Sequence, residues 1–340
     1  MSYHFLMDLA LILLSTKILG LAAQKFQMPQ VVGALIAGLI LSPAGLGLLS
    51  ETEFTAQLSE LGVIVLMFSA GMGTDIKELK NSGKAGFMVA VLGVVVPFIM
   101  GTALAWGADE LGLIESTGFI ENIFIGTILT ATSVSITVET LKEMKKLETK
   151  VGNTILAAAL IDDVLGLVAL TLVCSLAGGD ESIGMVLLKI AGFFAFAFVV
   201  GFAANRVFCW MLKRQHGWAS HRNSVFAFVL CLVMAYCAEE FFGVADITGA
   251  YAAGLAVACT PKGTYIQTKY NPLGYLLLTP VFFASIGINV QITGLTGGML
   301  AFSLLLLLIS IISKLLGCGL GAKACHFSTR ESIQVGAGMA

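Results

Sequence analysis

Long apolar stretches recur along the whole chain, and they constrain its fold more than any other feature. Each is close to the ~20 residues that an α-helix needs to cross the hydrocarbon core of a bilayer. Of the 340 residues, 57% are hydrophobic and only 12% are charged, which lies outside the usual composition of a soluble domain. The stretches lack the alternation of membrane β-strands, and in lipid the backbone must pair within each span. The sequence therefore predicts an all-α membrane protein that crosses the bilayer many times.

Proline, glycine and charged clusters mark the ends of eleven complete spans. We place them at residues 5–24, 29–49, 55–73, 84–107, 118–141, 151–177, 183–211, 222–241, 245–259, 266–290 and 297–322. A twelfth span begins near residue 329. The N-terminus has no basic flank followed by a cleavage site, so the first stretch is predicted to be a retained span and not a signal peptide.

Basic residues concentrate in alternate loops, which supports this span count independently. Fifteen of the 19 Lys and Arg residues follow the pattern, and the intervening loops carry Glu and Asp in their place. Lys and Arg collect on the cytoplasmic side of a membrane. We therefore expect a multi-pass protein of a prokaryotic cell (inner) membrane, with its N-terminus outside and the loop after the first span inside.

The remaining composition excludes several classes of site. A net charge of -2 and the lack of a polybasic tract give no basis for binding nucleic acid. The seven cysteines lie in or beside apolar stretches and form no CxxC pair, so we interpret them as packing residues. All four histidines fall outside the spans, which excludes a histidine metal site inside the membrane. The glycine-rich segment 317–321 lies inside a span and predicts close helix packing. No cofactor is expected.

Three charged residues are predicted near the middle of the membrane. Asp162 and Asp163 lie roughly 18 Å into the sixth span, and Lys314 lies deep in the eleventh. An acid at the centre of a membrane helix costs about 2.5–3.5 kcal/mol on insertion scales, which favours a functional role over neutralisation by helix packing alone. Neighbouring residues on a helix point about 100° apart, so the two carboxylates need different partners. We predict that Lys314 pairs with Asp162.

A cluster of hydroxyl side chains precedes the acidic span. The segment Thr130-Ala-Thr-Ser-Val-Ser-Ile-Thr137 places five hydroxyls at membrane depth. Hydroxyls favour local backbone hydrogen bonds, and freed carbonyls with hydroxyls are the hard oxygen ligands that a small cation prefers. The segment predicts an interruption of the helix. The alternative is an intact helix whose hydroxyls bond to their own carbonyls.

Several segments together carry a family resemblance. They are Leu61-Gly-Val-Ile-Val-Leu-Met-Phe-Ser-Ala-Gly71, Thr130-Ala-Thr-Ser-Val-Ser-Ile-Thr-Val-Glu-Thr-Leu141, Ile161-Asp-Asp-Val-Leu-Gly166, Gly249-Ala-Tyr-Ala-Ala-Gly-Leu255, Phe282-Phe-Ala-Ser-Ile-Gly287 and Ser313-Lys-Leu-Leu-Gly317. Because these segments occur together and in this order, the chain resembles the monovalent cation:proton antiporter-2 family. That family comprises prokaryotic sodium/proton antiporters and their Kef-type potassium-efflux relatives.

The resemblance implies an inverted-repeat antiporter fold of about 12–13 transmembrane helices, two of them broken, of which this chain holds 11 complete and one partial. It implies an ion-binding core of about residues 55–177 and 297–340, and a dimerisation or panel part of about 1–50 and 183–290, which forms a homodimer. The family continues past Gly336-Ala-Gly-Met339 into a second interrupted helix and a final span, so we expect that either the chain is truncated at Ala340 or its gene is incomplete. Glu139 replaces the polar or basic residue of many relatives, and we assign it no role.

The resemblance also implies a function. Two adjacent acids at the position of Asp162 and Asp163 are typical of electrogenic members, so we expect exchange of a monovalent cation, first Na⁺ or Li⁺, for protons. Asp163 is predicted to bind the cation and carry the proton, with help from Thr132 and Ser133, and Lys314 to act as the buried counter-ion.

Three alternatives remain open. The first is a K⁺/proton antiporter or a gated efflux system of Kef type, although the soluble nucleotide-binding domain usual in such systems is not in this chain. The second is an intramembrane aspartyl protease, which instead needs its two acids on facing helices. The third is a scaffold protein of the membrane, which would not need buried charges.

Overall fold

The computed structural model describes residues 3–113, 118–177, 183–214, 220–260, 263–291 and 297–340, and the ordered elements in them are helices. The helices are α1 (His4–Lys25), α2 (Gln30–Leu41), α3 (Glu53–Met72), α4 (Ile76–Glu110), α5 (Phe119–Ile128), α6 (Val134–Glu143), α7 (Lys150–Leu176), α8 (Ile183–Arg214), α9 (Ser220–Phe242), α10 (Asp246–Ala258), α11 (Gly263–Leu273), the π-helical segment η1 (Gly274–Leu278), α12 (Thr279–Ile288), α13 (Gly297–Ala324) and α14 (Thr329–Met339).

Among the described residues, eight helical segments are long and apolar enough to cross a membrane. They are His4–Lys25, Glu53–Met72, Lys77–Glu110, Lys150–Leu176, Ile183–Met211, Asn223–Phe242, Gly263–Ile288 and Gly297–Ala324. The other expected spans appear as the shorter helices α2, α5 with α6, α10 and α14. The prediction of an all-α membrane protein is confirmed.

Local chemistry explains where two helices depart from the expected spans. Helix α4 begins well before residue 84, because the Asp75 side chain accepts a hydrogen bond from Lys77 N at 2.8 Å and caps the helix. The first turns of α4 carry lysines, so the helix extends beyond its apolar part. Helix α2 ends at Leu41, because Ser42 adopts an extended conformation before Pro43 and Gly47 has a φ of +64°.

The expected span at 118–141 is interrupted. Helix α5 ends at Ile128 and α6 begins only at Val134, with Ser133 as its N-cap. The hydroxyl segment therefore breaks the helix as predicted, and the alternative of an intact helix is wrong. The span at 266–290 is continuous but contains Pro272, and the π-helical segment η1 begins two residues after this proline, at Gly274.

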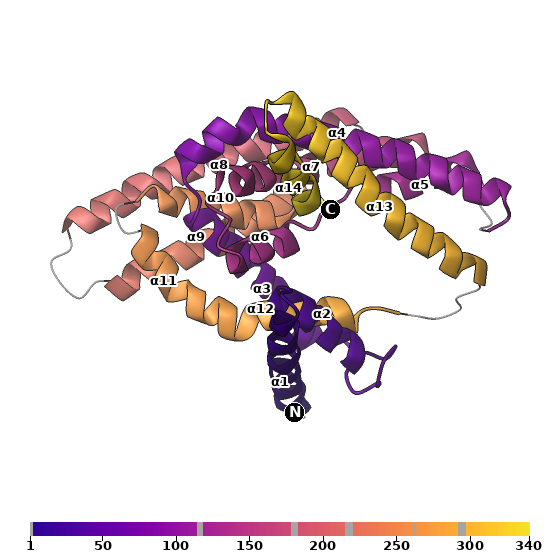
Figure 1. The fold of residues 1–340 in the computed structure, drawn as a ribbon. Coiled ribbons are helices and arrows are strands. Elements are labelled where there is room, and N and C mark those ends of the chain that lie inside the picture. The colour runs from indigo at the N-terminus through magenta and orange to yellow at the C-terminus, as the bar shows by residue number, and fades with distance from the viewer. Residues whose placement is uncertain (1–2, 114–117, 178–182, 215–219, 261–262, 292–296) are drawn as a thin grey trace.

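One group of helices is formed by α4, α5, α7, α13 and α14, which pack against one another in the upper half of Figure 1. Glycines allow these helices to approach closely. A Cβ added to Gly317 of α13 would lie 2.4 Å from the Leu92 carbonyl oxygen of α4, and one added to Gly321 would lie 2.8 Å from the Val89 Cα. Small residues at such contacts are typical of membrane helices, so the predicted packing role of segment 317–321 is confirmed.

A second group contains α1, α2, α3, α9, α10 and α12, and α8 packs against α9, α10 and α7. Helix α3 belongs here by its packing, because a Cβ on Gly71 would lie 2.3 Å from the Tyr251 carbonyl oxygen of α10. We expected residues 55–73 in the core with the acidic span, whereas α3 packs chiefly against α10 and α12. The contact depends on two facing glycine surfaces, Gly71 and Gly254, that lie far apart in the sequence.

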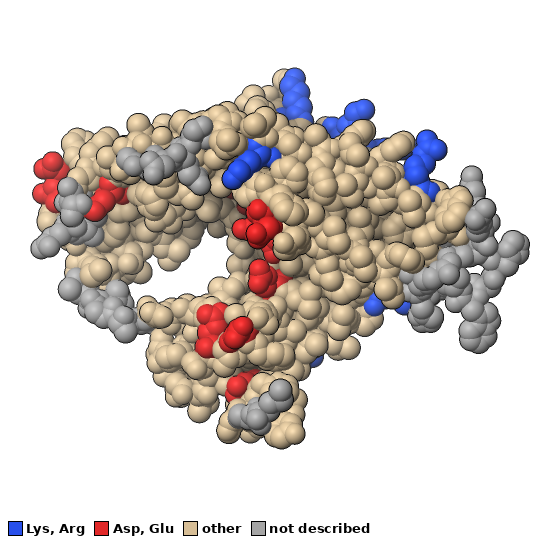
Figure 2. All heavy atoms as spheres, turned by 180° about the vertical axis from the view of Figure 1, so that it is seen from behind, with Lys and Arg blue, Asp and Glu red and all other residues tan. Residues whose placement is uncertain are grey.

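Charge is unevenly distributed on the face shown in Figure 2. The Lys and Arg side chains visible there gather mainly along the upper margin, whereas Asp and Glu side chains lie around and below an opening in the middle of the molecule.

Candidate cation site

The acidic pair is positioned by the most buried part of α7. Thr149 caps this helix, accepting a hydrogen bond from Gly152 N at 3.1 Å, and every residue from Gly152 to Ala159 is buried. The helix continues unbroken through Asp162 and Asp163. Asp162 is 2% exposed, whereas Asp163 is half-buried. The two neighbouring carboxylates therefore lie in different environments, as their angular separation requires.

Asp162 faces Lys314 of α13, which is also only 2% exposed. The Lys314 Nζ lies 3.1 Å from Asp162 Oδ2 and 3.4 Å from Asp162 Oδ1. The predicted ion pair between these two residues is present. A buried pair needs further hydrogen bonds to offset the cost of removing both charges from solvent.

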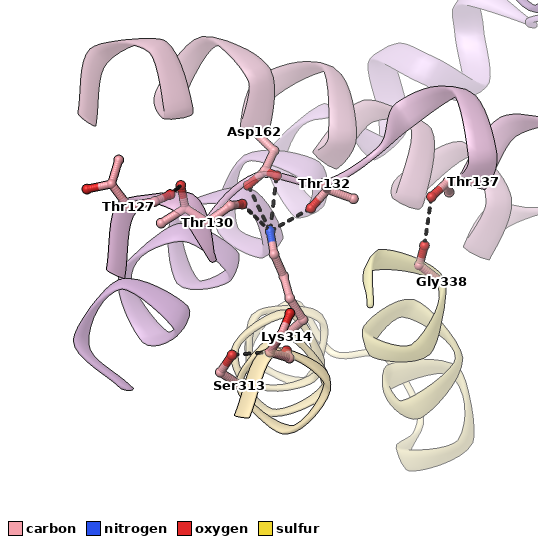
Figure 3. A network of polar contacts seen from close by, with 9 residues as sticks. Thr127, Thr130, Thr132, Thr137, Asp162, Ser313, Lys314 and Gly338 are labelled. Atoms are coloured by element: carbon pink, nitrogen blue, oxygen red, sulfur yellow. Dashed lines mark hydrogen bonds and ion pairs between the residues drawn. The ribbon is translucent and has the colours of Figure 1, made fainter. Parts of the chain in front are cut away.

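Those bonds come from the break between α5 and α6. Lys314 Nζ donates to the Thr130 carbonyl oxygen and to Thr132 Oγ1, each at 2.6 Å (Figure 3). The Thr130 carbonyl is available because α5 has already ended at Ile128. An ammonium has three N–H donors. Here they serve the Asp162 carboxylate of α7 and the Thr130 carbonyl and Thr132 hydroxyl of the break. Lys314 thus joins α13, α7 and the interrupted helix.

Helix α14 and the interrupted helix are also connected by a polar contact. Ser328 forms a capping box with Glu331 at the start of α14. Near the other end of α14, the Gly338 carbonyl oxygen accepts a hydrogen bond from Thr137 of α6 at 3.2 Å (Figure 3). Helix α14 therefore lies beside α6 as well as against α7.

Asp163 borders a cavity of about 550 Å³. Its buried Oδ2 atom makes no hydrogen bond to the protein. The cavity is lined from α5 and the break by Thr127 and Thr130, and from the other helix group by Glu239 of α9 and Thr248 of α10. A carboxylate oxygen without a protein partner, beside hydroxyls and an open volume, is able to bind a cation or a proton.

The structure separates the sequence-predicted site residues into two sets. Asp162, Thr132 and Lys314 form the hydrogen-bonded cluster, and Asp163 borders the cavity together with Asp162. Ser133 caps α6, accepting from Ile136 N at 3.5 Å, and neither Ser133 nor Thr132 lines the cavity of Asp163. The role of both hydroxyls as cation ligands remains a prediction.

Two polar residues at this cavity escaped the sequence analysis. Glu239 lies at the end of α9, where it looked like an ordinary loop acid. Thr248 directly precedes the small-residue segment Gly249–Leu255 and is a single hydroxyl at membrane depth. A search for lone hydroxyls inside spans would have found Thr248, but its position opposite Asp163 depends on the packing.

Comparison with known proteins identifies relatives over nearly the whole chain. The family model described as the transmembrane sodium/hydrogen exchanger matches residues 10–340. The Na⁺/H⁺-K⁺ antiporter GerN of Bacillus cereus is 37% identical over 341 residues, which cover 100% of this chain and 85% of that protein. The Na⁺/H⁺ antiporter of Enterococcus hirae is 36% identical over 338 residues, which cover 99% of this chain and 86% of that protein.

A solved structure shows the same fold. The sodium proton antiporter MjNhaP1 of Methanocaldococcus jannaschii superposes with a TM-score of 0.75, covering 98% of this chain and 81% of that chain at 18% sequence identity. The present chain therefore shares its arrangement of helices with MjNhaP1, although most of the residues differ.

Proposed function

Because the chain belongs to the sodium/hydrogen exchanger family, we propose that it is an electrogenic antiporter that exchanges Na⁺ or Li⁺ for protons. Asp163 carries this proposal. It is a half-buried carboxylate at a cavity, with a buried oxygen that makes no hydrogen bond to the protein, next to a buried ion pair. Within the family we assign the chain to the antiporter-2 branch, on the basis of Asp162 and Asp163 together with the segments quoted above.

Exchange follows from one carboxylate serving both ions. When Asp163 binds the cation its proton must leave, and when it is protonated it no longer attracts the cation. The two ions therefore cross in opposite directions. The helix group that carries Asp163 and Lys314 moves against the other group and exposes the carboxylate to each side of the membrane in turn.

Lys314 makes the exchange electrogenic. A cation that binds at the two aspartates competes with the ammonium for Asp162, so Lys314 loses its counter-ion and releases its proton. An additional charge then moves in each cycle, and the membrane potential contributes about 2.3 kcal/mol per charge per 100 mV.

We further propose that the protein resides in the cell membrane with its N-terminus outside, and that it forms a homodimer through the panel part. With this orientation the loop between α9 and α10 is outside, so the cavity beside Asp163 lies on the outer side. The packing supports a panel part that also includes α3. The protein performs transport and no covalent chemistry.

Potassium is the second candidate cation. The relative GerN is named as a Na⁺/H⁺-K⁺ antiporter, which favours K⁺ as an additional substrate of this chain. The other compared relative is named for Na⁺ alone. We therefore rank Na⁺ and Li⁺ before K⁺.

Transport by the protein in proteoliposomes tests the proposal. A pH gradient is imposed, Na⁺, Li⁺ or K⁺ is added in turn, and the collapse of the gradient is followed with a fluorescent pH probe. Na⁺ or Li⁺ should collapse the gradient at the lowest concentration. The Asp163→Asn protein should be folded, as judged by gel filtration and melting temperature, and should exchange nothing. Exchange that persisted in this variant would refute the role of Asp163.

A further inference from the structure

Thr248 is a buried hydroxyl that its surroundings do not explain. The residue is 6% exposed, and its Oγ1 atom makes no hydrogen bond to the protein. Two buried threonines of α7, in contrast, use their hydroxyl locally: Thr171 donates to the Leu167 carbonyl and Thr154 to the Lys150 carbonyl, both at 2.8 Å. A buried hydroxyl without a partner costs free energy, so its presence needs a reason.

The cavity beside Thr248 supplies that reason. Thr248 and Asp163 line the same volume of about 550 Å³, and each has a buried side-chain oxygen that makes no hydrogen bond to the protein. On its other side Thr248 borders a crevice lined mainly by apolar side chains, such as Phe194 and Leu255, where a hydroxyl gains nothing. Of the two volumes that Thr248 borders, the one shared with Asp163 contains the acidic and hydroxyl side chains.

The two oxygens come from different helix groups. Asp163 is carried by α7, which packs with α4 and α5, and Thr248 by α10, which packs with α3 and α9. We propose that Thr248 Oγ1 is a ligand of the transported cation and completes, from the second helix group, the oxygen shell that Asp163 begins. A hydroxyl and a carboxylate are hard oxygen donors suited to Na⁺ or Li⁺.

The charges around Thr248 are compatible with a cation. Thr248 lies in the first turn of α10, where the helix end carries a partial positive charge that opposes a cation. Asp246 in the same turn and Glu239 at the cavity wall supply negative charge that offsets it. The Thr248 hydroxyl is therefore a neutral ligand, and the carboxylates of Asp246 and Glu239 supply the negative charge near it.

This inference rests on the proposed antiport and has a consequence for the cycle. A cation held by Asp163 and Thr248 at the same time joins the two helix groups while the cavity is open to the outer side of the membrane. When the groups move relative to each other, the Thr248 contact is lost and that of Asp163 remains. Thr248 thereby contributes to affinity on one side of the membrane only.

Three variants test the assignment in proteoliposomes. Thr248→Val removes the hydroxyl with little change of shape and should weaken the apparent Na⁺ affinity from the cavity side by about tenfold, which corresponds to about 1.4 kcal/mol. Thr248→Ser retains the hydroxyl and should remain close to the wild type. Thr171→Val removes a buried hydroxyl of α7 that bonds within its own helix, and its Na⁺ affinity should not change.

A second measurement separates a ligand from a structural residue. Without Na⁺, Thr248→Val should melt at the wild-type temperature or above, because it removes an unpartnered polar group. Its Na⁺-induced rise in melting temperature should be smaller than that of the wild type. If Thr248→Val does not fold, Thr248→Cys provides the same test, since a thiol is a poor ligand for a hard cation.

The outcomes distinguish this inference from the proposed function. If the wild type and Thr171→Val exchange Na⁺ for protons while Thr248→Val retains wild-type affinity and thermal shift, the role of Thr248 is refuted and antiport stands. Equal impairment of Thr248→Ser and Thr248→Val also refutes it. If the wild type exchanges none of the three cations, the proposed function itself fails.

Discussion

At the scale of single residues, Lys314 is the position where folding and transport make opposite demands. Its ammonium is held by Asp162, the Thr130 carbonyl and Thr132, so it stabilises the contact of three helices. In the proposed cycle, in contrast, the bond between Lys314 and Asp162 is broken each time a cation binds. Leaving one buried charge without its partner costs free energy. This cost limits which substitutions of Asp162 or Lys314 the fold tolerates.

Replacing Lys314 should separate these two roles. Lys314→Gln leaves Asp162 without a cationic partner and should lower the free energy of unfolding by about 3–5 kcal/mol. The double variant Asp162→Asn/Lys314→Gln should recover much of this loss, because no unpaired charge remains. The measurement is the melting temperature in detergent, with Lys323→Gln at the exposed end of the same helix as the control.

The same variant addresses electrogenicity. Active Lys314→Gln protein should move less charge per cation than the wild type, as recorded by currents on solid-supported membranes alongside ion flux. The Lys323→Gln control should keep the wild-type ratio. An unchanged ratio in Lys314→Gln would leave Lys314 with a structural role alone.

At the scale of elements, the broken helix depends on the tight contact between α5 and α4. A Cβ added to Gly126 of α5 would lie 2.1 Å from Thr102 Oγ1 and 2.6 Å from the Phe98 carbonyl oxygen, both of α4. This contact holds α5 against α4 close to the break, where the Thr130 carbonyl accepts from Lys314. Glycine is needed here for close approach, because no side chain fits between the helices.

Gly126→Ala should therefore push α5 away from α4. We expect a loss of about 1–3 kcal/mol in stability, the usual cost of overpacking, and reduced exchange because the carbonyl moves away from Lys314. Gly107→Ala on the neighbouring helix α4 is the control, since its added Cβ would have no neighbour within 4 Å. Equal melting temperatures and exchange rates of the two variants would contradict this account of the contact.

At the scale of the whole molecule, the two sides of the acidic pair differ. On the side of Glu239 and the residues 243–245, the cavity reaches Asp163. On the side of α6, Ile136 packs against a cluster formed by α2, α3 and α12, and Glu143 accepts a hydrogen bond from Gln30 N at 2.7 Å. The two helix groups therefore contact each other on the side of α6 and lie apart on the side of Glu239. This is expected for a carboxylate that is accessible from one side of the membrane.

Cysteine labelling should detect the opposite state as well. In a protein whose native cysteines are replaced, Leu167→Cys at the cavity wall should react with a membrane-impermeant maleimide from both faces. Na⁺ concentration and pH should shift the balance between the faces. Ala158→Cys is the control, because Ala158 is fully buried on the same helix and should react from neither face. Labelling of Leu167→Cys from a single face under all conditions would argue against alternating access.

Local sequence patterns predicted much of this protein. Hydropathy located the spans, because a bilayer imposes a fixed length of apolar helix. The cost of a charge in lipid identified Asp162, Asp163 and Lys314, and their depths along two spans predicted the ion pair that the structure contains. The hydroxyls between Thr130 and Thr137 predicted the break, because such side chains compete with the helix for backbone bonds.

Tertiary structure decided which oxygens meet at each carboxylate. Thr132, which is predicted to help Asp163 bind the cation, accepts a hydrogen bond from Lys314, and Ser133 caps α6. Thr248 reaches the cavity of Asp163 from a span more than eighty residues away in the sequence, and α3 joins the group of α10. Periodicity and hydropathy describe one helix at a time. Which faces of two distant helices meet depends on the fit of their surfaces, such as Gly71 against Gly254, and that information exists only in the folded arrangement.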